Sequence, residues 1–364
     1  IDAGKKGVEI TPVWNKSNRE HIIIGTEPAD VRREADEAVK DAKFRKPYFV
    51  DADHINFDTV GRFIDVSDFF TIDVAAYIGQ KACEEDIKAF VKKAGKYRGK
   101  LHIQGIPKPF NITTTYLKKV AEKYLFATKM AGVIYRKIEK LKGAGKFVTE
   151  VSMDEVPEPQ TPAELFFILM MLSIENIPLQ TIAPKFQGRF NKGVDYVGNP
   201  ELFALEFETD LLVIRHAVKL FGLPENLKIS VHSGSDKFAL YPHIGRIIRK
   251  YDAGIHLKTA GTTWLEEVTG LAIAGGEALM FVKEMYKRAY EKIDELCAPY
   301  ADVIDIKMER LPSPDTVMKW DSKKFSSAII HDSKNPDYNP DMRQLIHVGY
   351  KLAALRMKEY IELL

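Results

Sequence analysis

The sequence predicts an α/β fold, a (β/α)8 barrel of the TIM type with an extra N-terminal segment. Strand-like and helix-like segments alternate through most of the 364 residues, which indicates βαβ units and a parallel sheet. Polar side chains recur on one face of several candidate strands, near the carboxyl ends where barrel proteins place their chemistry. A doubly wound open sheet is the alternative.

The chain is expected to form one barrel with an appended N-terminal piece. Residues 1–45 are rich in charge and read as an extension packed on the barrel, and residues 46–364 read as the barrel itself. No low-complexity linker divides the chain, and a barrel of this length forms a single domain. Ile1 is an unusual first residue, which leaves open whether residues are missing upstream.

The candidate elements follow one another in a regular order. Amphipathic spacing predicts helices over 83–97, 114–142, 162–175, 200–222 and 342–364. Short runs of β-branched and aromatic residues predict strands at 48–55, 69–75, 101–106, 147–153, 179–186, 228–233, 254–259, 303–308 and 326–332.

Composition excludes several classes of protein. The chain is 45% hydrophobic and 29% charged, with a formal net charge of +2 and both signs interspersed. It has no basic stripe for nucleic acid, and its longest apolar runs are too short for a membrane span. Cys83 and Cys297 are far apart and lack a CxxC context, which fits a reducing compartment. We therefore expect a cytoplasmic protein, and an oligomer is compatible with the sequence.

Two histidines near the ends of neighbouring strands predict a metal site. In "KISVHS", His232 shares a face with Ser230, and in "GIHLK", His256 shares one with Lys258. Because parallel strands lie about 4.8 Å apart, two imidazoles at similar height could bind one ion. His54, with Asp51 and Asp53 in "DADHI", is available as a further ligand. Such a set fits Zn²⁺, Mn²⁺, Fe²⁺ or Ni²⁺; the alternative is structural histidines beside an Asp-rich helix cap.

Carboxylates and cations near the same strand ends suggest roles toward a substrate. Asp53 and Glu150 are candidates for proton transfer, although either one could instead orient a histidine ligand. The cations expected to bind an anionic substrate are Lys185, Arg189, Lys237 and Lys258. One or two of them could instead neutralise the acidic residues, and a Schiff-base role for Lys258 is conceivable.

Four stretches resemble the tagaturonate epimerases of bacterial hexuronate catabolism. They are "FVDADHI", "SVHSGSDKFALYP", "IHLKTAGTTWLEE" and "NPDMRQLIHVGYKLAA", and the resemblance covers roughly residues 45–355. The resemblance implies a barrel, a divalent metal cofactor and interconversion of D-tagaturonate and D-fructuronate. The expected binding partner is therefore a small keto sugar acid, the substrate. By motif position, the resemblance matches the family's metal-binding histidines to His54, His232 and His256.

The implied reaction inverts a carbon that is not adjacent to the ketone, so simple enolisation cannot invert it. Retro-aldol cleavage and recombination can, because they form an enediolate and an aldehyde whose face can turn. An aldose–ketose uronate isomerase, a class II-type sugar-acid aldolase and a non-enzymatic sugar-acid sensor remain alternatives, because one barrel scaffold hosts many functions.

Overall fold

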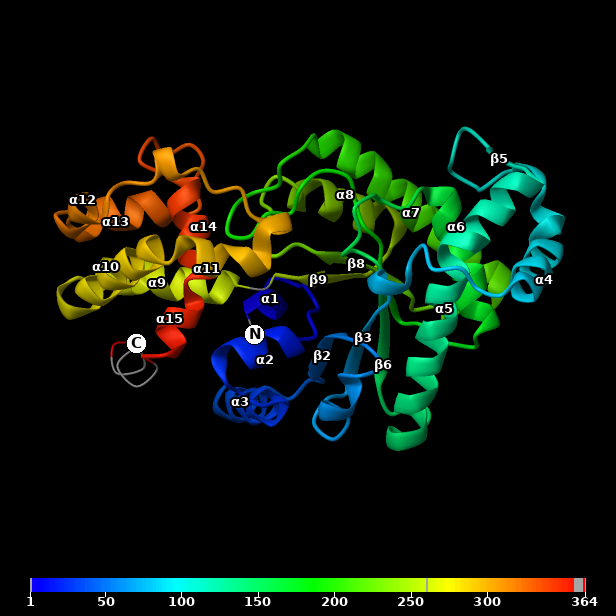
Figure 1. The fold of residues 1–364 in the computed structure, drawn as a ribbon, viewed down its shortest axis with the longest axis horizontal. Coiled ribbons are helices and arrows are strands. Elements are labelled where there is room, and N and C mark those ends of the chain that lie inside the picture. The colour runs from blue at the N-terminus through cyan, green and yellow to red at the C-terminus, as the bar shows by residue number, and fades with distance from the viewer. Residues whose placement is uncertain (1, 260, 357–362, 364) are drawn as a thin grey trace. The chain divides into compact units, whose positions relative to one another are not determined.

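The computed structural model describes residues 2–259, 261–356 and 363 (Figure 1). Contacts divide the chain into two compact units. The first comprises Ile1–Gln187, Ala204–Val231 and Ile247–His256, and the second comprises Gly188–Phe203, His232–Arg246 and Leu257–Leu364. The chain passes from the first unit to the second at the carboxyl ends of two strands, β8 (Lys228–His232) and β9 (Ile255–Lys258).

A seven-stranded sheet forms the core of the first unit. Its strand order is β1-β2-β3-β6-β7-β8-β9, and the neighbouring pairs from β1–β2 to β7–β8 are parallel. The remaining strands of this sheet are β1 (Val13–Ser17), β2 (Phe49–Ile55), β3 (Phe69–Asp73), β6 (Val148–Ser152) and β7 (Thr181–Ala183). The order follows the chain without reversal, unlike that of a doubly wound sheet.

The sheet is open, so the closed eight-stranded barrel that we expected is not confirmed. Among the described residues, β1 and β9 stand at the two edges of a half-barrel and do not pair with each other. The expected strand 326–332 is wrong, because Ser322–Ile329 forms helix α13, which Asp321 caps by accepting a hydrogen bond from the Lys324 amide. The expected strand 303–308 is also wrong: Val303 ends one 3-10 turn, Met308 begins another, and the residues between them form no strand. In short apolar runs, hydrophobic periodicity cannot distinguish a buried strand from a segment of helix.

The N-terminal region is part of the sheet rather than an appended piece. β1 pairs in register with β2, from Val13 beside Phe49 to Ser17 beside Asp53. Its Ser17 then caps helix α2 (Asn18–Ile24) in a capping box with Glu20. Helix α3 (Pro28–Asp41) buries Val31 and Ala35 against the sheet. The strand was not predicted from the sequence because charged residues surround its short apolar segment.

Helices cover the sheet of the first unit. They include α5 (Thr114–Lys142), α6 (Pro162–Ile174) and α7 (Pro200–Phe221), and α5 contacts α6 and β3; α4 (Glu84–Ala94) packs on α5, farther from the strands (Figure 1). α6 is apolar on all sides and almost wholly buried. The expected strand 101–106 is wrong beyond its first residue: β4 (Gly99–Leu101) pairs antiparallel with β5 (Phe110–Ile112). The other elements are α1 (Asp2–Lys5), α8 (Tyr241–Tyr251), η1 (Val60–Arg62), η2 (Ala75–Tyr77) and η3 (Gly95–Tyr97).

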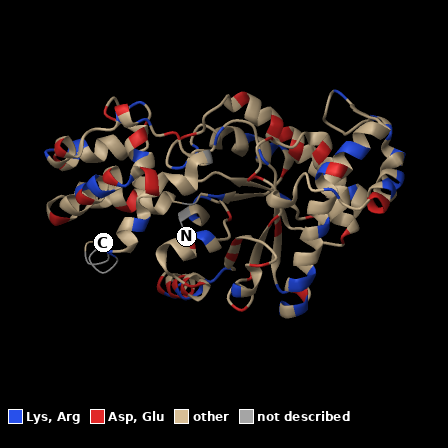
Figure 2. Cartoon of the chain, viewed as in Figure 1, with Lys and Arg blue, Asp and Glu red and all other residues tan. Residues whose placement is uncertain are grey.

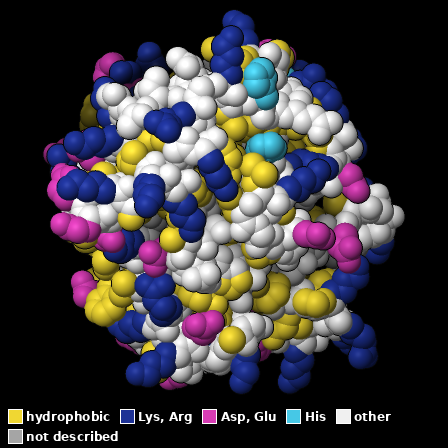
Figure 3. All heavy atoms as spheres, turned by 90° about the vertical axis from the view of Figure 1, so that its right-hand side faces the viewer, with side chains coloured by type: hydrophobic (Ala, Val, Ile, Leu, Met, Phe, Trp, Pro, Cys, Tyr) yellow, Lys and Arg dark blue, Asp and Glu magenta, His cyan; other side chains and the backbone are white. Residues whose placement is uncertain are grey.

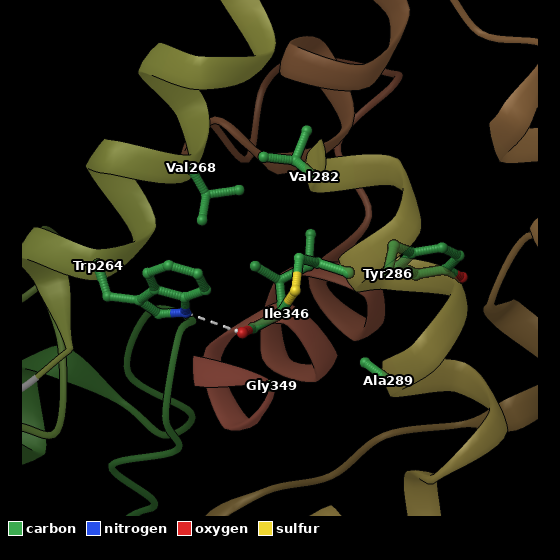
Figure 4. Close-up of a pocket in the computed structure, with 8 residues that line it drawn as sticks. Trp264, Val268, Val282, Tyr286, Ala289, Ile346 and Gly349 are labelled. Carbon is green, nitrogen blue, oxygen red and sulfur yellow. Dashed lines mark hydrogen bonds between the residues drawn. The ribbon is translucent and has the colours of Figure 1, made fainter. Parts of the chain in front are cut away.

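The core of the second unit is helical. α9 (Thr262–Ala274) packs against α10 (Gly276–Glu291), α13 and α14 (Pro340–Val348). Figure 4 shows Trp264 of α9 beside Ile346 of α14, and its indole N–H donates to the Ile346 carbonyl at 2.9 Å. The expected helix 342–364 breaks at Gly349, and α15 (Tyr350–Ala354) follows; 357–362 and 364 lie outside the described residues. The remaining elements are α11 (Ile293–Cys297), α12 (Pro314–Met318), η4 (Ala298–Val303) and η5 (Met308–Arg310).

Surface charge is mixed, as the composition predicts. Lys and Arg alternate with Asp and Glu along the helices (Figure 2), and the face in Figure 3 shows both signs among apolar side chains. Within the described part of the chain, none of the helices has the length and hydropathy needed to cross a membrane.

Candidate metal centre

Two histidines and an aspartate meet at the carboxyl ends of three strands of the sheet. His54 is the penultimate residue of β2, Asp154 follows β6 by two residues, and His232 ends β8. One ligand atom from each lies within 4.8 Å of the other two. Two imidazoles and a carboxylate form a donor set that suits a divalent transition metal.

The backbone at His54 is unusual in a way that serves this grouping. Its φ is +50°, a region that non-glycine residues rarely adopt. The pairing of β2 with β3 shifts register between Ala52 and Ile55, which marks a bulge around this position. Bulges redirect single side chains at strand ends, and strained backbone concentrates at functional sites. The local geometry therefore aims the His54 ring toward the neighbouring strand ends.

Hydrogen bonds orient the His54 ring. Its Nδ1 lies 2.8 Å from Asp53 Oδ1, and its Nε2 lies 3.4 Å from Asp154 Oδ1. Because a carboxylate only accepts, Nδ1 donates a proton to Asp53; a cation that replaced the proton between Nε2 and Asp154 would take Nε2 as its ligand atom. A carboxylate that fixes a histidine in this way is the usual outer partner of a metal ligand. Asn15 in turn donates to Asp53 Oδ2 at 3.4 Å.

The electrostatics of this group favour a cation. Burial lowers the pKa of His54, but the carboxylates of Asp53 and Asp154 outweigh it and hold that pKa well above its usual value. Burial raises the pKa of the nearby Asp73 at the end of β3, and Asp154 adds to the rise. Several carboxylates gathered around one imidazole thus attract positive charge, which a divalent cation supplies as well as a proton does.

A polar ladder crosses the neighbouring strands β2, β3, β6 and β7. The Thr71 hydroxyl lies 2.9 Å from Asp51 Oδ2 and 3.2 Å from Glu150 Oε1. Thr181 donates to Glu150 Oε2 at 2.6 Å. Glu150 is 0% exposed, so both of its oxygens are engaged deep in the sheet. These contacts fit a carboxylate that holds strands together more directly than one that meets a substrate.

The structure brings together two of the three histidines expected as ligands. His54 and His232 belong to the group, and its third member is Asp154 rather than His256. The His256 ring stacks on Phe69 of β3, with centroids 5.0 Å apart.

The four expected substrate-binding cations have different surroundings. Lys185 follows β7, and its amide donates to the Gln160 side chain at 2.8 Å. Arg189 lies 3.7 Å from Asp305 and is half exposed. Lys237 is buried, as is Lys258, whose carbonyl accepts from the Ser233 hydroxyl at 2.7 Å.

Sequence reasoning missed Asp154 and Asp73. Asp154 directly follows the expected strand 147–153, so its place at a strand end was readable. Nothing in the sequence distinguished Asp154 as a metal ligand from an aspartate that caps a helix. Asp73 lay inside the expected strand 69–75 without a neighbouring histidine to mark it.

A parallel sheet with an oriented His–Asp–His group at its carboxyl edge defines a class of protein: an α/β enzyme with a candidate metal centre. The comparisons with known proteins specify the class further. The family model described as tagaturonate epimerase matches residues 3–361, nearly the whole chain. The chain therefore belongs to the tagaturonate epimerase family.

Known relatives agree with this assignment. The chain is 26% identical over 347 residues to the tagaturonate/fructuronate epimerase of Thermotoga maritima, covering 92% of this chain and 66% of that protein. The native crystal structure of the fructuronate-tagaturonate epimerase of Cohnella laeviribosi superposes with a TM-score of 0.75 at 24% identity, covering 96% of this chain and 72% of that one. Its complex with two glycerols gives 0.77 at 24% identity, with coverages of 98% and 74%. These structures support the fold.

Proposed function

We propose that the chain is an epimerase that interconverts D-tagaturonate and D-fructuronate. The observation that carries this proposal is the family match over residues 3–361. The curated relative bears the same activity in its name. The grouping of His54, Asp154 and His232 at the sheet edge supplies a location for the chemistry.

A divalent cation held by His54, Asp154 and His232 is part of the proposal. The donor set and the oriented His54 ring fit Zn²⁺, Mn²⁺, Fe²⁺ or Ni²⁺. A bound cation of this kind supplies Lewis-acid stabilisation of negative charge that develops on substrate oxygens. Asp53 acts through His54, holding its ring and its tautomer.

The proposed chemistry is retro-aldol cleavage followed by recombination. A base removes the proton from the hydroxyl of the carbon that inverts, and the bond between that carbon and its neighbour next to the ketone breaks. The electron pair passes into the enediolate of one fragment, and the other fragment becomes an aldehyde. Rotation of the aldehyde and re-formation of the bond return the proton with inverted configuration. Of the two carboxylates expected to transfer protons, Asp53 lies beside His54, whereas Glu150 is enclosed by Thr71 and Thr181.

This chemistry predicts that the inverted carbon keeps its own hydrogen. We expect the purified protein in D₂O to convert tagaturonate to fructuronate with essentially no deuterium at that carbon, because only its hydroxyl loses a proton. NMR of the product measures the label. Stoichiometric deuterium at the inverted carbon would refute the retro-aldol route and favour direct deprotonation.

The same NMR assay separates the rival functions. An aldose–ketose isomerase would yield an aldehyde sugar, an aldolase would release free three-carbon products, and a sensor would bind the sugar acid without turnover. We place the protein in the cytoplasm, in keeping with its free cysteines Cys83 and Cys297. Its partner is then a small keto sugar acid rather than nucleic acid or a membrane, and an oligomer is compatible with this role.

A further inference from the structure

The second unit contains buried positive charge that the proposed metal chemistry does not use. Lys237 and Arg343 are each 1% exposed. Burying a charge costs several kcal/mol unless a partner compensates it. Lys237 Nζ donates to the Ser235 hydroxyl at 2.9 Å and to the Ser235 carbonyl at 3.1 Å, both neutral acceptors. Within the described residues, no carboxylate forms an ion pair with Lys237.

Arg343 has a different role, since the backbone already takes up its guanidinium. Nε donates to the Gly193 carbonyl at 2.7 Å, and Nη1 donates to the Ile329 carbonyl. The Gly193 amide donates to the Ser235 hydroxyl at 3.1 Å. Arg343 therefore braces the loop that carries Ser235 and Lys237. Its ion-pair partner in the described part of the chain, Glu266, has a side chain that is 59% exposed.

Two polar atoms close to these cations are buried without a hydrogen-bond partner among the described residues: His331 Nδ1 and the Tyr338 hydroxyl. The His331 ring stacks on Tyr338, with centroids 6.0 Å apart, and contacts Phe238, the residue after Lys237, at 5.0 Å. Native proteins seldom leave such atoms unsatisfied, and a ligand, ion or water usually explains them.

The neighbouring carboxylates do not fill this need. Asp195 accepts from the Ala239 amide at 3.2 Å, and Asp236 accepts from the Tyr241 hydroxyl at 2.9 Å. Asp195 is thus engaged with the segment that follows Lys237, and Asp236 with the start of α8. Lys237, which no carboxylate contacts directly within the described residues, and the two unsatisfied neutral groups together match one carboxylate, which offers two oxygens and a single negative charge.

We propose that Lys237, His331 and Tyr338 bind the carboxylate of the sugar acid. This inference rests on the proposed function, because it assigns the one charged group of that substrate to named residues. A carboxylate fits better than a phosphate, because Arg343 is tied to backbone carbonyls and Lys192 lies over the Tyr300 ring at 5.1 Å, so that among the described cations of this region Lys237 is the one assigned to the ligand. Charge-assisted hydrogen bonds from an ammonium to a carboxylate are the stronger kind.

The protonation of Lys237 makes the proposal testable. Burial lowers the pKa of Lys237 to about 7, against the opposing pull of Asp195 and Asp236, with Lys192 and Arg343 lowering it further. Below pH 7 the ammonium is present, and above pH 7 the amine is mostly neutral. A bound carboxylate favours the ammonium and raises this pKa. Binding at pH 8 should therefore take up a proton, and binding at pH 6 should not.

The first experiment is steady-state kinetics on tagaturonate. In the wild type, KM should stay level below pH 7 and rise above it. In Lys237→Met, KM should be roughly 10- to 100-fold higher than the wild-type value at pH 6 and should not change with pH, while kcat changes much less. Tyr338→Phe, which conserves shape, should raise KM several-fold. Lys334→Met, at an exposed position of the same unit, is the control. A wild-type KM and pH profile in Lys237→Met would overturn the proposal.

The second experiment does not require turnover. Calorimetry of D-gluconate binding at pH 8, in two buffers of different ionisation enthalpy, measures proton uptake. We expect close to one proton for the wild type, none for Lys237→Met, and no uptake with the neutral polyol D-glucitol. If the wild type fails to epimerise tagaturonate yet shows this linkage, the carboxylate site stands while the proposed function falls. Binding of inorganic phosphate but not gluconate at Lys237 would overturn the carboxylate site.

Discussion

Replacing His54 with alanine should abolish both divalent-metal binding and epimerase activity. Loss of Lewis-acid stabilisation of about 4 kcal/mol corresponds to a factor of about a thousand in kcat. His54 approaches Asp154 through Nε2 and is held by Asp53 through Nδ1, so no neighbouring side chain replaces its ring. Kinetics by NMR and metal analysis of the same preparation measure the two losses.

Two further variants separate chemistry from folding. His54→Asn removes the imidazole but suits the positive φ of this position, since asparagine adopts that region more readily than alanine does. It should lose activity while folding normally. His102→Ala, at an exposed histidine outside the group, should retain wild-type activity. Full activity in metal-free His54→Asn would contradict the assignment.

Replacing Gly261 with alanine should strongly destabilise the second unit. Gly261 has a φ of +83°, and a Cβ there would lie 2.1 Å from His347 Cε1. His347 is buried on α14 and cannot easily move away. Backbone strain of about 1–2 kcal/mol adds to overpacking of about 1–3 kcal/mol. Urea unfolding measures the loss in the free energy of unfolding.

A matched control isolates the steric part of that cost. Gly276 has a φ of +53° in the same unit, and a Cβ there would meet nothing within 4 Å. Gly276→Ala should therefore lose only the backbone contribution, about 1–2 kcal/mol. Equal losses in the two variants would show that the close approach of His347 does not limit this position.

The parallel sheet was predictable because its strands are short apolar runs between amphipathic helices. Its edges were not predictable in the same way. The sequence pattern of β1 was not recognisable among the charged residues around it. Its place in the sheet depends on long-range pairing with β2. Residues 326–332 were mistaken for a strand because an apolar run of this length has no decisive period. Asp321, the N-cap of α13, was the overlooked signal.

The candidate metal centre was predictable in part for a similar reason. A histidine that breaks the apolar pattern of a strand is visible, which is how His232 and His256 were found; His54 was added from the polar end of its strand and from the family resemblance. Their distances depend on the register shift in β2 and on the height at which β6 ends. Those features place Asp154 in the group and His256 against Phe69. The sequence also named Lys237, but its burial and the unsatisfied Tyr338 hydroxyl of the same unit emerge only from the fold.

The most direct test is to measure metal content and tagaturonate epimerisation on one preparation of the purified protein, before and after chelation. We predict close to one divalent cation per chain, loss of epimerisation when a chelator removes it, and recovery when Zn²⁺, Mn²⁺, Fe²⁺ or Ni²⁺ is returned. Undiminished epimerisation by protein that retains no divalent cation would contradict the account.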